Sequence, residues 1–523
     1  MRLAKILAAT AILSLPSACS GQPAEPARPT DLGVNLNTIA FWDGSTPFEN
    51  LIYGSDWQMQ GPAGAQDVPQ SSRDPDGWVQ SLPAGYRVIR TLSVPPDAMH
   101  VTCEWQGNDH NSMEVGGDGV TSNIVRKRGI NELSFDYRST YPGGAKAAFL
   151  SFTVDPSNYV RGLNCRDASR HDAGGFDPTL VDALRGFGVI RFMKWQPAVE
   201  ANRPVSWATR NKPGDGSYFL NDGVPVETMV TLANRLGAEP WFTIPWNADD
   251  DYVSRFAAYV RDNVGPGRQI YVETSNEVWN GGYPVMHQAQ AEGVAEGLDA
   301  SNGGYGQAMY RYAEKTQHVM QIWSKVFEGQ GNRLVRVISA QNVSPFWSEK
   351  ILGHGRTADY VDALATAPYW AFMDADYSGQ SLDQIMDKML PAQIGDALDW
   401  AAQQKAIARK YNKRYIAYEG GQHVWLNKNA PLVARIERDP RMANLYRSYI
   451  DGWSSKIGDT LTLFALTGPP GNAGFGLVEY AGQPIGAAPK MRAVRGFLRR
   501  SGSGLDAARK GVNDGLRDPR RGR

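Results

Sequence analysis

The chain has 523 residues, more than one ordinary domain needs, so a second domain is expected. Its 54 basic and 54 acidic side chains give a formal net charge of zero, which argues against a polyanion such as nucleic acid as a partner. The seven histidines show no His-x-x-His spacing. We therefore expect neither a metal site nor a cofactor.

The first residues are typical of an export signal. A charged start, Met1–Lys5, precedes an apolar run, Ile6–Leu15, that is too short to span a bilayer. The run leads into Pro-Ser-Ala-Cys19, which resembles a bacterial lipoprotein box. We predict a signal peptide over 1–18, a lipid on Cys19 and an extended tether over 19–30. The expected location is the periplasm or outer membrane of a bacterium, with the lipid as the only membrane contact; simple secretion is the alternative.

The next two stretches differ in pattern. Asp31–Asn37 is apolar and precedes an aromatic loop, Phe41–Asp43, as the first strand of a parallel barrel would. Residues 55–165 are short alternating runs broken by Gly, Pro, Asn and Asp, such as Tyr86–Ser93. This pattern predicts an antiparallel β-sandwich inserted after the first barrel strand. We interpret the insert as a brace on the barrel; a carbohydrate-binding module is the alternative.

Two cysteines, Cys103 and Cys165, fall within the insert. An even pair in an oxidising compartment is compatible with a disulfide. Two buried free thiols are the alternative, because the sequence gives no distance between them.

From residue 166 onward, helical and strand patterns alternate. Helices are predicted at 177–186, 226–236, 250–263, 307–328 and 382–411. Predicted strands end at Trp195, Pro245, Glu277, Ser339, Tyr369, Glu419 and Leu466. Together with 31–37 they make the eight strands of a (β/α)8 TIM barrel. The predicted barrel covers 31–54 and 166–500, and a flexible basic tail covers 501–523.

Two predicted strands end in a glutamate, Glu277 and Glu419. Barrel strands deliver catalytic side chains to the rim, and glycosidic cleavage needs two carboxyls on opposite sides of one sugar C–O bond. Glu277 is predicted to be the acid, because Trp279 offers an apolar wall that favours the protonated form. Glu419 is predicted to be the nucleophile, because Gly420 and Gly421 leave room for a sugar ring.

The run Ser275-Asn276-Glu277 after an apolar strand, with a later strand ending in Tyr418-Glu419-Gly420, resembles the retaining glycoside hydrolases of clan GH-A, the cellulase-like (β/α)8 enzymes. The resemblance covers residues 30–55 and 175–500. It implies that Arg191 steadies the nucleophile and that Tyr369 hydrogen-bonds it, while the amide of Asn276 can hold a substrate hydroxyl. The clan usually has a tryptophan on strand eight, where this chain has Phe464.

Further substrate contacts are expected from side chains at strand ends and in the loops that follow. They are Trp195, Trp246, Asn247, Trp279, Trp370 and His423. About half of the tryptophans are expected to pack loops instead. Glu273 is interpreted as a structural ion-pair partner, and Asp249 to Asp251 as helix-capping residues.

These observations predict a monomeric, retaining glycoside hydrolase that cleaves O-glycosidic bonds of an oligo- or polysaccharide by double displacement through two glutamates. A noncatalytic carbohydrate-binding protein on a glycosidase-like scaffold is the alternative. A polysaccharide lyase, with Arg191 as the neutralising cation, is a third hypothesis.

Overall fold

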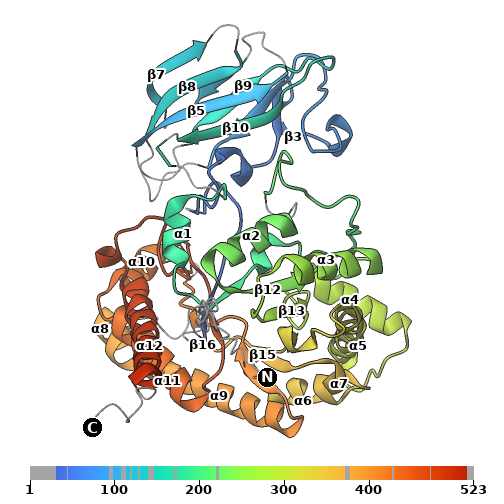
Figure 1. The fold of residues 1–523 in the computed structure, drawn as a ribbon, viewed down its shortest axis with the longest axis vertical. Helices are drawn as coiled ribbons and strands as arrows, with labels where there is room; N and C mark the ends of the chain where they lie inside the picture. The colour runs from blue at the N-terminus through green and yellow to red at the C-terminus, as the bar shows by residue number, and fades with distance from the viewer. Residues whose placement is uncertain are drawn as a thin grey trace, which may run out of the picture.

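The computed structural model describes residues 31–514, except for 44, 94–97, 108–112, 118–119, 128–129, 139–146, 168, 171–173, 220–222, 371–376, 378, 427–428 and 472. The predicted signal peptide, Cys19 and the tether lie outside the described residues. Figure 1 shows a β-rich domain stacked along the long axis on a larger body of strands and helices. No helix in the described part is both long enough and apolar enough to cross a membrane.

The larger body is a closed barrel of eight parallel strands. Their order is β1 (Leu32–Asn35), β11 (Val189–Arg191), β12 (Glu239–Ile244), β13 (Ile270–Thr274), β14 (Leu334–Ser339), β15 (Ala363–Thr366), β17 (Arg414–Ala417) and β19 (Leu461–Leu463). β1 pairs with β11 on one side and with β19 on the other, which closes the ring. The predicted (β/α)8 fold is confirmed.

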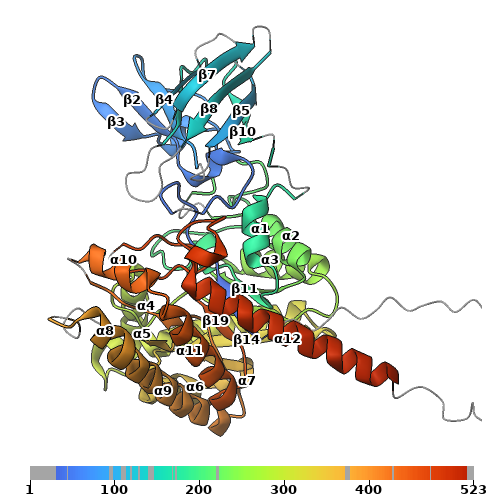
Figure 2. The ribbon, with the colours of Figure 1, turned by 90° about the vertical axis from the view of Figure 1, so that its left-hand side faces the viewer.

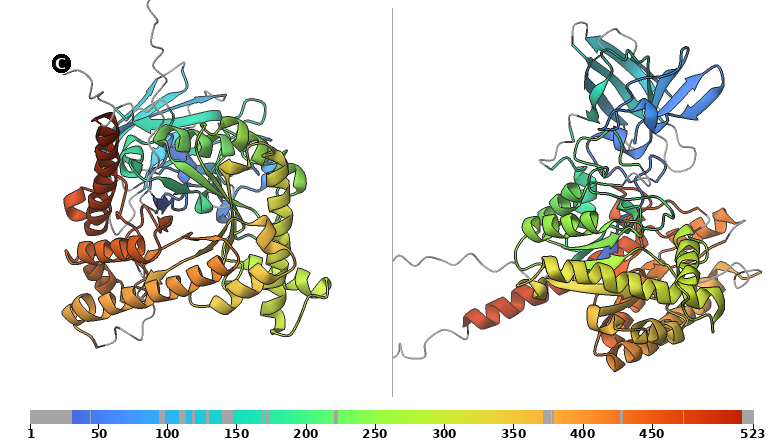
Figure 3. Two further views of the ribbon diagram at one scale, coloured as in Figure 1. Left: turned by 60° about the horizontal axis from the view of Figure 1, so that its bottom comes forward. Right: turned by 90° about the vertical axis from the view of Figure 1, so that its right-hand side faces the viewer.

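Helices surround the barrel (Figure 3). They are α1 (Pro178–Leu184), α2 (Val226–Leu236), α3 (Asp250–Asn263), α4 (Pro284–Ala295), α5 (Gly303–Val326), α6 (Pro345–Gly353), α7 (Thr357–Tyr360), α8 (Leu382–Gln384), α9 (Leu390–Lys410), α10 (Ala430–Arg438), α11 (Met442–Lys456) and α12 (Pro489–Asp514). A π-helical turn, Ile385–Met389, joins α8 to α9. α2 and α3 have the predicted bounds, and Asp249 caps α3 by accepting from the Tyr252 amide.

The last helix departs from the prediction. α12 packs beside α11 along the outside of the barrel (Figure 2) and continues to Asp514, whereas the sequence places a flexible tail from residue 501. The run Leu505–Lys510 has Leu, Ala, Arg and Lys at five of six positions, which all favour helix, so the predicted boundary at residue 500 is too early. Residues 515–523 lie outside the described part.

The inserted domain is a sandwich of two antiparallel sheets. One has the order β3 (Gly64–Asp67), β2 (Gln58–Gly61), β4 (Arg87–Thr91), β9 (Phe149–Phe152), β6 (Glu114–Gly116). The other has the order β10 (Arg161–Asp167), β5 (Ala98–Gln106), β8 (Glu132–Arg138), β7 (Val120–Lys127). Buried side chains of both sheets, such as Val88 and Phe135, share one hydrophobic core. The predicted sandwich is therefore present.

A disulfide joins Cys103 of β5 to Cys165 of β10, which face each other in the register of the sheet. Both cysteines are completely buried in the sandwich core. The bond closes a loop of 62 residues that includes β6 to β9.

Replacing both cysteines by alanine should lower the free energy of unfolding of the inserted domain. The chain-entropy model gives about 4 kcal/mol for a loop of this length. Urea unfolding, followed by tryptophan fluorescence with and without reductant, measures the effect. An equal midpoint for the variant and for the oxidised protein would show that the bond does not stabilise the domain.

Candidate active site

Polar side chains meet at the carboxyl ends of the barrel strands, the edge where parallel barrels carry their sites. Arg191 ends β11, Glu277 follows β13 by three residues, and Glu419 follows β17 by two. All three side chains are buried. The structure brings together the acid, the nucleophile and the arginine that the sequence indicates.

Arg191 is the centre of this group. Its Nη1 donates to Glu419 Oε1 at 2.9 Å and to Asn35 Oδ1 at 3.0 Å. Its Nη2 donates to Glu273 Oε2 at 2.9 Å and to Asn276 Oδ1 at 2.7 Å. The guanidinium is 0 % exposed and lies between two carboxylates, so its charge is neutralised within the barrel. Glu273 also accepts from the indole of Trp241, in the structural role predicted for it.

Both oxygens of Glu419 have fixed donors. Arg191 holds Oε1, and the hydroxyl of Tyr369 donates to Oε2 at 2.8 Å. Burial raises the pKa of Glu419, while the Arg191 charge and the Tyr369 hydrogen bond lower it. The two contacts favour the ionised form and fix the orientation of the carboxylate.

Glu277 has a different environment. Tyr418 Oη donates to its Oε1 and Asn280 Nδ2 to its Oε2, both at 2.9 Å. No cationic side chain of the described residues forms an ion pair with it. Burial, and next the negative charge of Glu419, raise the pKa of Glu277 to about 7. Glu277 is thus the carboxyl of the pair that holds a proton near neutral pH.

The turn after β13 determines where Glu277 points. Ser275 and Glu277 have left-handed backbones, with φ of 58° and 46°. Residues other than glycine rarely adopt this conformation, and it persists where the surroundings impose it. Here Ser275 is anchored on both sides, by its amide to Ile244 O at 2.7 Å and by its hydroxyl to Ala198 O at 2.5 Å.

A group of rings lies beside Glu419. The ring of Tyr369 lies 5.2 Å from that of His423 and 6.4 Å from that of Phe464. Phe475 stacks on His423 at 5.0 Å and meets Phe464 edge-on at 5.3 Å. Burial lowers the pKa of His423 to about 4, so the imidazole is neutral at pH 7. All four rings are partly exposed, as an aromatic surface for a sugar requires.

Three of the tryptophans predicted to contact substrate are almost completely buried. Trp195, Trp246 and Trp370 are each 1 % exposed. Trp195 donates to Asn37 O and Trp246 to Glu292 Oε1, while Trp370 packs on Tyr446 and Tyr449. Their rings are enclosed by protein, so no ring face is open to a substrate in this structure. Burial of a large indole ring is favourable, which explains why these tryptophans face the protein interior. The distance of a residue from a strand end in the sequence does not reveal which way its side chain turns.

Two further predicted contacts are partly buried. The amide of Asn247 is engaged by Gln288 in hydrogen bonds of 3.0 and 2.6 Å. Trp279 packs against the core between barrel and helices. The side chain of Asn247 therefore has its partner within the protein, and the ring of Trp279 has part of its surface covered by the core.

Sequence reasoning missed Tyr418, Asn280, Phe475 and Asp43. Asp43 accepts hydrogen bonds from Asn37 Nδ2 at 2.7 Å and from Ser45 Oγ at 2.8 Å. Burial raises the pKa of Asp43 to about 8. The available signal was position alone: Tyr418 and Asn280 flank the two glutamates, and Asp43 ends the aromatic loop after the first strand.

In the described part, no group of three or more His, Cys, Asp or Glu side chains is placed to hold a metal ion.

No protein-family model and no curated protein sequence matches this chain. Similar solved structures include a GH51 arabinofuranosidase from Xanthomonas axonopodis pv. citri, with 13 % identity over 57 % of this chain and a TM-score of 0.34. A beta-glucosidase from Thermotoga maritima has 14 % identity over 57 % of this chain and 79 % of its own, with a TM-score of 0.33. A glycoside hydrolase family 5 mannosidase from Rhizomucor miehei has 11 % identity over 63 % and 87 %, with a TM-score of 0.35. The chain spans 62 % of the length of the arabinofuranosidase.

Replacing Arg191 by leucine should destabilise the protein by about 3 to 5 kcal/mol, because Glu273 and Glu419 would remain buried without their cation. Urea unfolding measures the loss. Arg255→Leu is the matched control, since Arg255 pairs with Asp251 at the surface, and it should change stability far less. If the two variants were equally stable, the central ion pairs would not be what holds the site together.

Proposed function

We propose that the protein is a retaining glycoside hydrolase that cleaves O-glycosidic bonds of an oligo- or polysaccharide. The observation that carries the proposal is the pair of buried strand-end carboxyls with opposite surroundings. Burial raises the pKa of both carboxyls, but Glu419 contacts a guanidinium and a phenol that oppose the rise, whereas the donors to Glu277 in the described part of the chain are neutral. One ionised and one protonated carboxyl at a single site are what double displacement at a sugar carbon requires.

In the first step, Glu277 donates its proton to the glycosidic oxygen as the bond from that oxygen to the anomeric carbon breaks. An oxygen of Glu419 forms a bond to the same carbon, which gives a glycosyl ester and releases the first alcohol. Arg191 and Tyr369 hold the attacking carboxylate in place. Tyr418 and Asn280 stabilise the carboxylate left on Glu277.

In the second step, Glu277 takes a proton from water while the water oxygen attacks the anomeric carbon and the ester bond breaks. Formation of the ester removes the charge of Glu419, which is one of the two main causes of the raised pKa of Glu277. The pKa of Glu277 therefore falls when it must act as a base and rises again when Glu419 is released.

The surroundings of Arg191 argue against a lyase. A lyase would need a cation to neutralise the carboxylate of a uronic acid, but Arg191 already has Glu273 and Glu419 as ion-pair partners.

A noncatalytic carbohydrate-binding protein would bind a glycan without cleaving it, whereas the proposed enzyme turns it over. Substitution of the nucleophile separates the two.

Glu419→Gln should abolish turnover of 4-nitrophenyl glycosides, with kcat reduced by at least about 10³-fold, because the amide cannot form the ester. A matched control is Glu296→Gln, which changes an exposed glutamate of the surface and should retain full activity. ¹H NMR of the first sugar released by the unsubstituted protein should show the anomeric configuration of the substrate. A product of inverted anomeric configuration would indicate a single displacement and not a double displacement. Binding without turnover by both the unsubstituted protein and Glu419→Gln would favour the noncatalytic alternative.

The pH dependence of kcat/KM should have its alkaline limb near pH 7. Glu277 is active as an acid only when protonated, so activity is present below its pKa and is lost as the pH rises through about 7. The Tyr418 hydrogen bond lowers the pKa of Glu277, so Tyr418→Phe should move this limb to higher pH. Tyr415→Phe, which removes another buried hydroxyl from β17, the strand that ends just before Tyr418, should leave the limb in place. A limb that is unchanged in Tyr418→Phe would mean that another group titrates there.

A further inference from the structure

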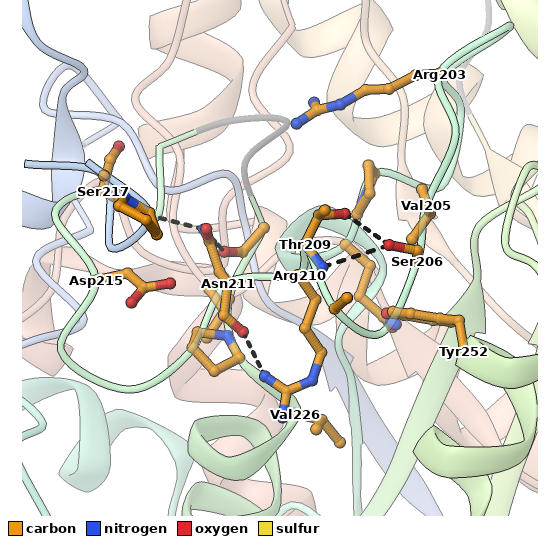
Figure 4. Close-up of a pocket in the computed structure, with 18 of the residues that line it drawn as sticks. Arg203, Val205, Ser206, Thr209, Arg210, Asn211, Asp215, Ser217, Val226 and Tyr252 are labelled. Atoms are coloured by element: carbon orange, nitrogen blue, oxygen red, sulfur yellow. Dashed lines mark hydrogen bonds between the residues drawn. The ribbon is translucent and has the colours of Figure 1, made fainter. Parts of the chain in front are cut away.

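A cavity of about 360 Å³ lies where the inserted domain meets the barrel (Figure 4). On one side it is lined by the segment Gln70–Gly77 of the insert, and on the other by the loop that joins β11 to α2. Its size is within the range of binding sites for small molecules. None of the proposed catalytic residues lines it.

The walls of this cavity are held by internal contacts. Arg73 forms an ion pair with Asp56 at 2.8 Å and donates to Val68 O at 2.7 Å. On the barrel side, Arg210 pairs with Glu227, and Asn211 donates to the carbonyls of Ser217 and Gly223. The cavity is therefore preformed, which reduces the ordering that a ligand would impose.

Arg90 ties the two walls together. This buried residue of β4 donates through Nη2 to Ile52 O at 2.7 Å and to Gly216 O of the barrel loop at 2.8 Å. Its guanidinium also stacks over Trp57 at 4.1 Å. The insert and the loop thus meet in a defined arrangement.

Three buried donors belong to side chains of the lining. Arg73 Nε, Arg210 Nε and Gln196 Nε2 are buried donors with no hydrogen-bond partner in the described part of the chain. Buried donors are normally satisfied, so acceptor atoms within the cavity are expected to complete the wall. Three arginines line the cavity, Arg73, Arg203 and Arg210. Arg73 and Arg210 pair with Asp56 and Glu227, and the carboxyls of Asp74 and Asp215 also line the cavity. The carboxylates therefore offset the arginine charges, and neutral oxygen atoms suit the wall better than an anion does.

The cavity lies on the same face of the barrel as the candidate active site. The insert leaves the barrel after β1 and the lining loop leaves it after β11, so both emerge on the face that carries Glu277 and Glu419. Gln196 lines the cavity and accepts from the Thr243 amide of β12 at 2.8 Å. Two residues later, Ala198 O accepts from Ser275, next to Asn276 and Glu277.

We propose that this cavity is an accessory subsite that binds neutral sugar units of an oligosaccharide away from the bond that is cleaved. The inserted domain then contributes directly to substrate binding as well as supporting the barrel. The inference rests on the proposed glycoside hydrolase activity and adds to it a preference for longer chains. Sugar hydroxyls supply the acceptors that the wall requires, and they donate to its carbonyl and carboxylate oxygens in turn.

Filling the cavity tests this subsite. Thr209 is exposed at its rim, where its hydroxyl meets that of Ser206 at 2.8 Å (Figure 4), and Thr209→Trp should block it. Thr231→Trp, at an exposed threonine of α2 away from the cavity, is the matched control. The probes are a 4-nitrophenyl monoglycoside series and β-1,4-linked gluco-, xylo- and manno-oligosaccharides of two to six units.

We expect Thr209→Trp to keep the kcat/KM of the unsubstituted protein on the monoglycosides. The rise in kcat/KM from short to long oligosaccharides should become about tenfold smaller in this variant. Thr231→Trp should keep that increase. An increase in kcat/KM that survives Thr209→Trp, or that is absent from the unsubstituted protein, would overturn the subsite. Failure to hydrolyse any monoglycoside would count against the proposed function instead.

Binding gives an independent measurement. Calorimetry of the three hexasaccharides with Glu419→Gln, alone and combined with Thr209→Trp, should show affinity for one of them that the second substitution weakens about tenfold. Equal affinities, or no binding to either protein, would overturn the subsite regardless of turnover. Thr209→Phe, with a smaller side chain, serves in the same comparison if the tryptophan variant does not fold.

Discussion

The buried charge of Arg191 is the constraint on which the rest of the site depends. A guanidinium without water requires compensating carboxylates and acceptors for its N–H groups. The barrel supplies them from β1, from β13 and its turn, and from the end of β17, in Asn35, Glu273, Asn276 and Glu419. Because these contacts come from three separate strands, the closure of the barrel and the geometry of the nucleophile depend on each other.

The same constraint separates the two glutamates. Arg191 is engaged by Glu273 and Glu419, and among the described residues Glu277 receives side-chain hydrogen bonds from Tyr418 and Asn280 alone. Burial raises the pKa of a carboxyl, and neutral hydrogen-bond donors lower it less than a cation does. Burial and the charge of Glu419 are therefore the main influences on the pKa of Glu277. The difference between the surroundings of the two glutamates thus follows from the position of one arginine.

Much of this arrangement could be predicted from sequence because it follows from hydrophobic runs that end in polar residues. The apolar strands before Arg191, Glu277 and Glu419 place these side chains at one edge of a parallel barrel. The orientation of loop residues could not be predicted in this way. Trp195 and Trp246 turn into the packing between barrel and helices, and Tyr418 contacts Glu277 although it neighbours Glu419 in the sequence. These outcomes depend on turns such as that at Ser275, whose left-handed backbone has no marker in the sequence.

A second buried ion pair supports the aromatic side of the site. Lys490 of α12 pairs with Glu437 of α10, and both are almost completely buried. Lys490 also donates to the carbonyl of Gly474, as does the side chain of Gln422, so the residue before Phe475 is held from two directions. Phe475 is the ring that packs on both His423 and Phe464 beside the nucleophile. The start of the C-terminal helix therefore helps to position the ring of Phe475. Rings from the segments that follow β15, β17 and β19 lie together beside Glu419, although the eighth strand has no tryptophan.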